Sequence, residues 1–118
     1  MYPRAVALSA ARARKLLLRF DNVSEAPHFD RVAFRTPRRI FATLAGDGRD
    51  VNFMFDPLAQ ETFCEMAPAA LAPVPGGWGR MGATRCDLKK VDEPIFIAAS
   101  EAAHERASEP RGSRRAKR

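Results

Sequence analysis

A chain of 118 residues suffices for one domain and a short tail, and at this length roughly two thirds of the unfolded surface can be buried without a metal or a disulfide. The net charge of +6 is concentrated at the ends, because residues 1–39 contribute +6, residues 40–106 contribute −4 and residues 107–118 contribute +4. Basic ends suit a polyanionic partner such as nucleic acid, anionic lipid or an acidic protein, and they also keep a small protein soluble. No apolar run reaches the ~20 residues of a membrane span, and the two cysteines lack metal-site spacing, so we expect a reduced, cytoplasmic protein without a cofactor.

The first expected element is a helix over residues of about 4–20. Apolar residues recur there at steps of four, three, four and three, which places them on one helical face: Val6, Ala10, Ala13, Leu17 and Phe20. A second face is basic and is either solvated or in contact with phosphate; it carries Arg12, Lys15 and Arg19.

The segment from Val32 to Pro57 predicts a three-stranded antiparallel meander. Aromatic and β-branched residues alternate with others in three short runs separated by two turns, a pattern typical of half-buried strands. The first turn has Pro37 at a position that favours a type I turn, and the second contains Gly46-Asp47-Gly48. In the middle strand, the alternation predicts one face with Ile40, Ala42 and Leu44 and the other with Phe41 and Thr43.

Asp56-Pro57 predicts the start of a second helix, because Asp is a favoured N-cap and Pro a favoured first residue. Its expected buried stripe is Ala59, Phe63 and Met66. Residues 68–82 then contain three prolines and four glycines, which excludes a helix and predicts a rigid loop. Trp78, the only tryptophan, either packs on the sheet or forms a surface aromatic beside Arg80 that can stack on a base or anchor a partner.

A further strand is expected over residues 83–88, followed by a third helix capped by Asp92 with a staple between Val91 and Phe96. The expected inner face of this helix contains Ile95, Ala98 or Ala99, and Ala102. His104, near its far end, is expected to be solvated or to interact with the helix dipole. The sequence predicts an α+β domain over residues 1–106, with a small antiparallel sheet on about three helices, and a disordered basic tail over residues 107–118.

Catalytic chemistry finds little support in the sequence. No carboxylate pair or metal-ligand cluster has a supporting context, and neither histidine has an obvious partner. His28, between Pro27 and Phe29, is more typical of a histidine packed and hydrogen-bonded at a sheet edge than of a general base. We therefore expect no enzyme activity.

The order of elements resembles the MmcQ/YjbR family. The resemblance covers roughly residues 5–106 and rests on Pro27-His28-Phe29, Ala33-Phe34-Arg35, Arg39 to Leu44, Asn52 to Pro57, and Pro73 to Gly82 with Thr84. Arg39 stands where the family has a lysine. Two positions depart from the family pattern: Ala83 stands where members often have Trp, and Met54 where many have Lys.

The resemblance implies an antiparallel sheet packed on helices, similar to the double-wing DNA-binding domain of a phage transcription factor, and it implies DNA binding. We expect a monomer that binds DNA through its phosphates, largely without sequence preference, because arginine is well suited to phosphate. The candidate contact residues lie on the first meander strand and its turn, around the Trp loop and in the tail: Arg31, Arg35, Arg38, Arg39, Trp78, Arg80, Arg85, Arg114, Arg115 and Lys117. The alternative is a protein-interaction module that uses the Gly/Trp loop around Trp78.

Overall fold

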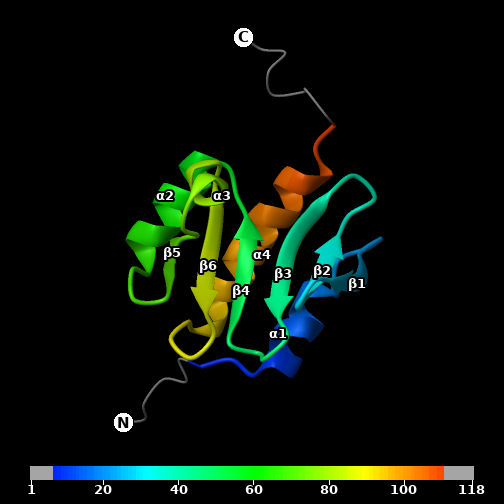
Figure 1. Cartoon of the computed structure of the whole chain (residues 1–118), viewed down its shortest axis with the longest axis horizontal. Coiled ribbons are helices and arrows are strands. Elements are labelled where there is room, and N and C mark those ends of the chain that lie inside the picture. Colours follow the sequence, from blue (N-terminus) through cyan, green and yellow to red (C-terminus); the bar gives the residue numbers. More distant parts are fainter. Residues whose placement is uncertain (1–6, 111–118) are drawn as a thin grey trace.

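Six antiparallel strands form one open sheet in the computed structural model, which describes residues 7–110 (Figure 1). The spatial order is β1-β2-β3-β4-β6-β5. The strands are β1 (Ser24–His28), β2 (Arg31–Arg35), β3 (Ile40–Ala45), β4 (Asp50–Met54), β5 (Leu71–Pro73) and β6 (Ala83–Asp87). The α+β class and the meander formed by β2, β3 and β4 are confirmed, and the sheet contains two more strands than the sequence predicted.

Four helices accompany the sheet: α1 (Ala10–Leu17), α2 (Pro57–Met66), α3 (Gly77–Arg80) and α4 (Glu93–Ser108). The predicted caps are confirmed, since the carboxylates of Asp56 and Asp92 accept the backbone N–H groups of Ala59 and Ile95. The first helix is shorter than expected, because Ser9 caps it. Val6 of its expected apolar face lies outside the described residues.

One face of the sheet is covered by α1 and α4, and α4 runs behind β3, β4 and β6 in Figure 1. Phe96 of α4 is fully buried with its ring centroid 5.3 Å from that of Phe53 on β4. Phe53 also stacks on Phe55 at 5.5 Å. Each such buried phenylalanine contributes about 1.5–3 kcal/mol through removal of apolar surface from water, so this contact is the centre of the core.

A β-bulge changes the faces predicted for β3. The β2–β3 register pairs Phe34 with Ala42 but Arg35 with Ile40, so Phe41 has no partner of its own. Phe41 is fully buried and its ring meets Phe20 edge-on at 5.8 Å, on the helix-covered side. Ile40 instead lies on the opposite face, so the prediction that it shares a face with Ala42 is wrong.

Other sequence predictions failed where tertiary contacts outweigh local pattern. Residues 68–82 hold both β5 and the short helix α3. Met66 is 53% exposed rather than part of a buried stripe. The inner face of α4 is displaced by one position from the predicted one, because Phe96 sets the rotation of the helix against the sheet; it contains Phe96, Ala99, Ser100, Ala103 and Ala107.

The C-terminal half of α4 is fastened to the sheet by two side chains. The ring of His104 stacks on Phe20 at 4.1 Å and meets Phe41 edge-on at 5.3 Å, so the expectation of a solvated histidine is wrong. The hydroxyl of the buried Thr36, at the start of the β2–β3 turn, lies 3.2 Å from the carbonyl oxygen of Ala107. The folded chain therefore continues beyond residue 106, the expected end of the domain.

The two cysteines are free thiols. Burial, with the nearby carboxylates of Asp87 and Asp50, raises the pKa of Cys86 to about 12, so its thiol stays protonated and acts as a small apolar group. Within residues 7–110, no helix is long and apolar enough to cross a membrane. The same residues contain no group of three or more His, Cys, Asp or Glu placed to hold a metal ion.

We expect stability to fall as the pH is lowered through about 6.5. Burial, and then the positive charge of Arg19, lower the pKa of His104 below its ordinary value. The unfolded chain therefore binds a proton that the folded chain disfavours, so this contribution is present above about pH 6.5 and is lost on acidification. Chemical denaturation at pH 7 and pH 5.5 measures it, and His104→Phe should reduce the difference. An unchanged difference in that variant would contradict the assignment.

The contacts of Ala107 set the minimal folded chain. A chain ending at residue 110 should retain the full free energy of unfolding. A chain ending at residue 106 should lose roughly 1–3 kcal/mol, because it lacks the buried Ala107 and the hydrogen-bond acceptor facing Thr36. Urea denaturation of the two chains tests this expectation, and equal midpoints would contradict it.

Candidate functional site

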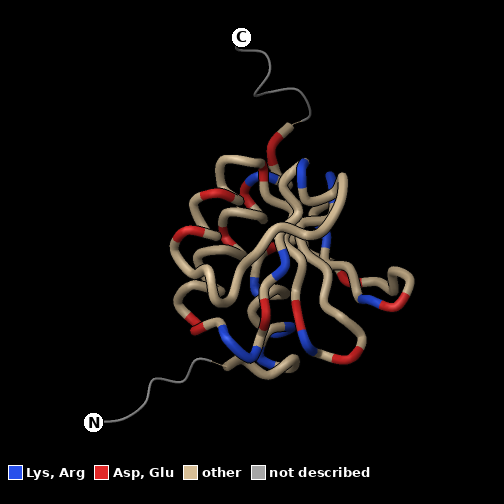
Figure 2. The backbone as a smooth tube through the Cα atoms, turned by 60° about the vertical axis from the view of Figure 1, so that its left-hand side comes forward, with Lys and Arg blue, Asp and Glu red and all other residues tan. Residues whose placement is uncertain are grey.

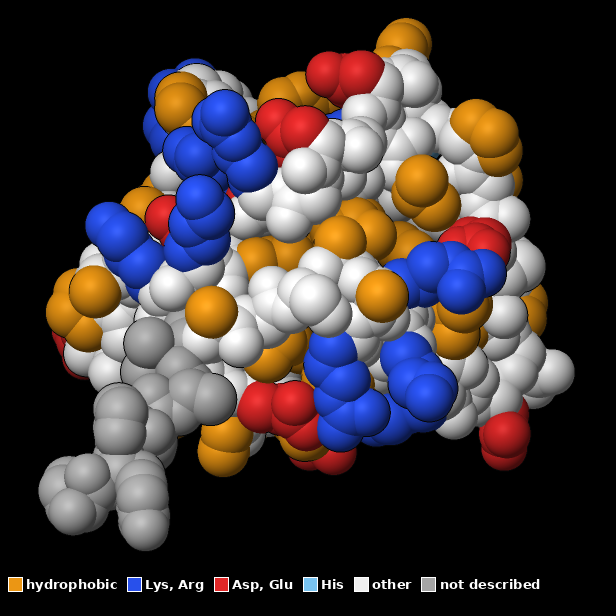
Figure 3. Space-filling model, turned by 90° about the horizontal axis from the view of Figure 1, so that it is seen from below, with side chains coloured by type: hydrophobic (Ala, Val, Ile, Leu, Met, Phe, Trp, Pro, Cys, Tyr) orange, Lys and Arg blue, Asp and Glu red, His pale blue; other side chains and the backbone are white. Residues whose placement is uncertain are grey.

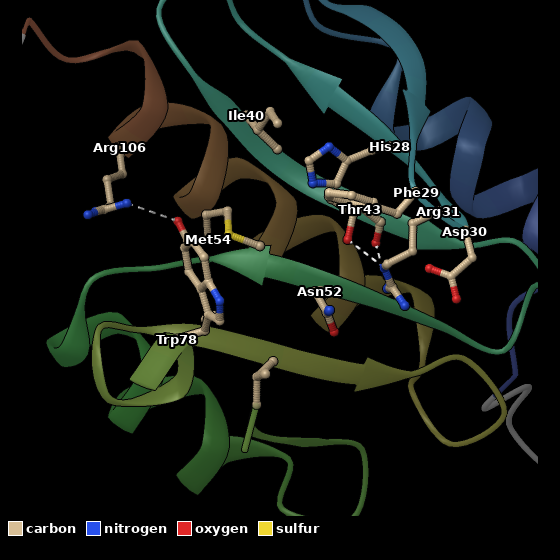
Figure 4. A pocket seen from close by; sticks show the side chains of 12 residues that line it. His28, Phe29, Asp30, Arg31, Ile40, Thr43, Asn52, Met54, Trp78 and Arg106 are labelled. Carbon is tan, nitrogen blue, oxygen red and sulfur yellow. Dashed lines mark hydrogen bonds between the residues drawn. The ribbon is translucent and has the colours of Figure 1, made fainter. Parts of the chain in front are cut away.

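The face of the sheet opposite α4 carries a cleft of about 560 Å³ (Figure 4). It lies over β3, β4 and the start of β6 and is mostly apolar. Its walls come from the β1–β2 turn on one side and from the segment around α3 on the other. The lining residues are His28, Phe29, Asp30, Arg31, Ile40, Thr43, Asn52, Met54, Val74, Trp78, Ala83 and Arg106.

The floor of this cleft combines apolar side chains with polar groups that retain hydrogen-bonding capacity. Thr43 and Asn52 are direct partners in the β3–β4 register, so their side chains lie next to each other on the open face. Thr43 accepts a hydrogen bond from Arg31 Nε at 2.7 Å, which leaves its own hydroxyl proton available. The Asn52 amide makes no hydrogen bond to any residue within the described range 7–110. The floor can therefore both donate to and accept from a bound group.

One wall of the cleft is a strained hairpin. His28 pairs with Arg31, so Phe29 and Asp30 form a two-residue turn. Phe29 has φ +60°, a conformation that costs a bulky residue of order 1–3 kcal/mol and that such turns usually assign to glycine. Its ring is 94% exposed, so core packing does not explain why a phenylalanine occupies this position. An exposed aromatic in a strained backbone is a candidate for function.

The other wall is the α3 segment, which presents Trp78 at 72% exposure. Two glycines allow this segment to approach its neighbours: a Cβ at Gly79 would lie 1.7 Å from the carbonyl oxygen of Val74, and one at Gly82, where φ is +120°, would lie 2.0 Å from that of Phe55. The side-chain amide of Gln60 on α2 donates to the carbonyl oxygens of Gly79 and Ala83 at 2.8 and 3.1 Å. Trp78 is thus an exposed ring on a firmly attached segment, which agrees with the surface interpretation.

The predicted arginine surface divides into two parts. Arg31 and Arg85 both bind the carboxylate of Asp50, at 2.7 and 3.3 Å, and Asp50 is only 13% exposed. Arg31 also donates to Thr43, so its position is fixed by the fold. These two ion pairs connect β2, β4 and β6 through Asp50, with the side chain of Arg31 21% exposed and that of Arg85 55% exposed.

The second group lies at the β2–β3 turn. The side chain of Arg38 is exposed, Arg35 donates to the carbonyl oxygen of Thr36, and Arg39 donates to that of Glu109 at 3.5 Å. Arg80 is exposed on α3, next but one to Trp78. The remaining candidates, Arg114, Arg115 and Lys117, lie outside the described residues.

The folded domain carries no net charge. Residues 7–110 contain 14 basic and 14 acidic side chains, so the +6 of the chain resides in residues 1–6 and 111–118. Basic and acidic positions are interspersed along the backbone in Figure 2. The face in Figure 3 shows Lys and Arg in separate groups with hydrophobic and acidic side chains between them. A continuous basic face is absent from that view.

The basic face of α1 is also engaged within the fold. Arg12 forms a two-point ion pair with Glu93 of α4, at 2.6 and 3.1 Å. Arg14 binds Glu25 of β1, and Arg19 lies 3.4 Å from Glu101 of α4. Arg12 and Arg14 thus connect α1 to α4 and β1, and Arg19 connects the residues that follow α1 to α4.

Several cleft residues were not among the sequence candidates, because nothing in the local pattern assigns them to a common surface. They are Phe29, Asp30, Ile40, Thr43, Asn52, Val74 and Arg106. Met54 and Ala83, where the chain departs from the family pattern, are direct partners in the β4–β6 register and both line the cleft. The two positions that differ from the family pattern therefore lie next to each other in the cleft.

Comparison with known proteins gives a likeness of fold. No protein-family model matches the sequence, and no curated protein matches it. Among solved structures, the chain is similar to the Deinococcus radiodurans protein DR2400, which has a DUF419 domain, with a TM-score of 0.65 and 13% sequence identity. The alignment covers 87% of this chain and 79% of DR2400. The two proteins share a fold.

The strain at Phe29 has a measurable consequence. Phe29→Gly should raise the free energy of unfolding by up to about 1 kcal/mol, because glycine adopts φ +60° freely and the exposed ring buries almost nothing. Urea denaturation measures the change, with Leu58→Gly as the control, since Leu58 is also exposed but lies in a helix where glycine is unfavourable. Equal destabilisation in both variants would show that the Phe29 ring supports the fold.

Proposed function

We propose that the protein is a non-enzymatic nucleic-acid-binding protein that contacts phosphates through the β2–β3 turn and the basic C-terminal segment. One observation carries this proposal. Arg39 donates to the carbonyl oxygen of Glu109, so the turn that bears Arg35, Arg38 and Arg39 lies beside the end of α4. Residues 111–118 follow directly and contain five basic and no acidic side chains. The basic turn therefore lies beside the end of α4, the point from which this basic segment continues in sequence.

Phosphate contact is the interaction that such an arrangement favours. Arginine binds phosphate with two parallel donors, and the exposed Arg38 has no ion-pair partner among residues 7–110. Residues 7–110 have no net charge and therefore add no long-range electrostatic attraction to nucleic acid. Binding should accordingly be weak and sensitive to salt. Since the contacts are to the backbone, they carry little sequence information.

The likeness in fold supports the same proposal by analogy. DUF419 is the YjbR/MmcQ-like family, the family that the sequence motifs resemble. The DNA-binding label of that family rests on a likeness of fold, and a shared fold is weaker support for a function than the charged residues of this chain. The contact set proposed here is accordingly narrower than the sequence suggested: it keeps Arg35, Arg38 and Arg39 with Arg114, Arg115 and Lys117, and it omits Arg31 and Arg85, which Asp50 holds.

A second candidate function is the binding of a protein partner at the Trp78 loop. The observation in its favour is the exposure of two large apolar side chains there, Trp78 at 72% and Met81 at 69%. Exposed aromatic residues are common anchors of protein interfaces.

The phosphate proposal predicts a specific salt dependence. For a labelled DNA duplex, log K should fall against log salt with a slope of about −0.9 per neutralised phosphate. Removing residues 111–118 should flatten the slope by about three units if roughly three of its charges reach the backbone. Arg38→Ala should flatten it by about one unit. Fluorescence anisotropy across a salt series measures each slope.

Arg49→Ala provides a matched control, because Arg49 is exposed but lies on the β3–β4 loop at the other end of β3, where it pairs with Asp47. It should leave the slope nearly unchanged. Equal effects of Arg49→Ala and Arg38→Ala would indicate general attraction rather than a defined contact. No binding of the intact protein at low salt would refute the proposal and favour the protein-partner candidate.

A further inference from the structure

We propose that the cleft on the open sheet face binds an unpaired base of single-stranded nucleic acid. This inference rests on the proposed function but concerns a different surface, since the phosphate contacts lie at the β2–β3 turn and the cleft lies over β3 and β4. It predicts that a single strand is a better ligand than a duplex.

The size and lining of the cleft suit a flat heteroaromatic group. Its volume of about 560 Å³ lies within the roughly 300–1,000 Å³ typical of small-molecule sites. Ile40, Met54 and Val74 supply apolar surface, as in such sites. A base that is paired and stacked inside a duplex does not expose its faces to a recessed site, so only an unpaired base can enter.

Aromatic rings stand on opposite sides of this cleft. Trp78 projects from α3 on one side, while His28 and Phe29 project from the β1–β2 turn on the other (Figure 4). His28 and Phe29 are themselves in edge contact, with centroids 5.0 Å apart. Proteins that bind single strands stack bases on exposed aromatic side chains of this kind. Such stacking tolerates any sequence, because every base has a π-face. The strain at Phe29 is consistent with selection for the ring rather than for stability.

Polar groups between the rings match the edge of a base. The Asn52 amide offers both donors and an acceptor, and the Thr43 hydroxyl offers a proton. The imidazole of His28 likewise makes no hydrogen bond to any residue in the range 7–110. Bases presented by single strands are bound through such edges.

Arginine side chains near two sides of the cleft could contact the phosphates on either side of a bound base. Ile40 lines the cleft and directly follows Arg38 and Arg39, so the proposed phosphate contacts adjoin its margin. Arg80 is exposed on α3 two residues after Trp78. A strand that crosses from the β2–β3 turn towards α3 would therefore meet cations before and after the base.

Trp78 is the only tryptophan, so its fluorescence reports directly on stacking in the cleft. The experiment titrates the full chain with a thymidine 12-mer, with an abasic deoxyribose-phosphate 12-mer and with a 12-base-pair duplex. We expect the single strand to quench the fluorescence and to bind at least roughly fivefold more tightly than the abasic strand, which retains every phosphate but has no base. The duplex should cause little quenching.

Variants separate the cleft from the phosphate contacts. Phe29→Ala and Asn52→Ala should weaken the base-dependent quenching, whereas Leu58→Ala, at another exposed apolar position outside the cleft, should not. Trp78→Ala, followed by anisotropy of the labelled strands, should abolish the preference for the thymidine strand while leaving affinity for the abasic strand unchanged.

The outcomes distinguish the two proposals. Equal binding of the thymidine and abasic strands, or equal quenching by duplex and single strand, would overturn base capture while leaving phosphate binding in place. No binding of any of the three would overturn both. Binding without quenching would also overturn base capture, because the bound strand would then not reach Trp78 in the cleft.

Discussion

The packing of α4 against one face of the sheet is the contact on which the rest of the structure depends. Phe96 meets Phe53 in the centre, and His104 stacks on Phe20 near the end of the helix. This interaction fixes which side of each strand is buried. Within residues 7–110, no helix covers β3 and β4 from the other side, so that face stays open (Figure 1). Its apolar and polar side chains together form the cleft (Figure 4).

The walls of the cleft are positioned by backbone contacts that only glycine permits. Gly79 and Gly82 allow the α3 segment to lie against the backbone of Val74 and Phe55, and this places Trp78 at the margin. On the other side, the N–H of Gly46 donates to the carbonyl oxygen of Asp30 and supports the turn that carries Phe29. These contacts fix the backbone positions from which the two exposed rings project. A fixed backbone lowers the entropy cost of binding at the cleft.

Many of the charged side chains in residues 7–110 form ion pairs with one another. Asp50 binds Arg31 and Arg85, Arg12 and Arg14 of α1 bind Glu93 and Glu25, and Arg19 lies beside Glu101. Much of the charge in residues 7–110 is therefore paired within that range. These pairs hold strands and helices in place but leave little net field. Residues 7–110 have no net charge, so the chain's net charge of +6 is contributed by residues 1–6 and 111–118. Within residues 7–110, Arg38 on the β2–β3 turn remains exposed.

The sequence by itself determined features whose physical cause lies within a few residues: the caps at Asp56 and Asp92, the alternation of β4 and the α+β class. Only the tertiary structure decided which side chains share a surface. The bulge moved Ile40 to the open face, and strand order placed Arg31 and Arg85 on one carboxylate. It also brought Phe29 and Trp78 to opposite walls of one cleft. Local pattern specifies backbone preference, whereas these contacts depend on strand register and helix packing, which join positions far apart in the chain.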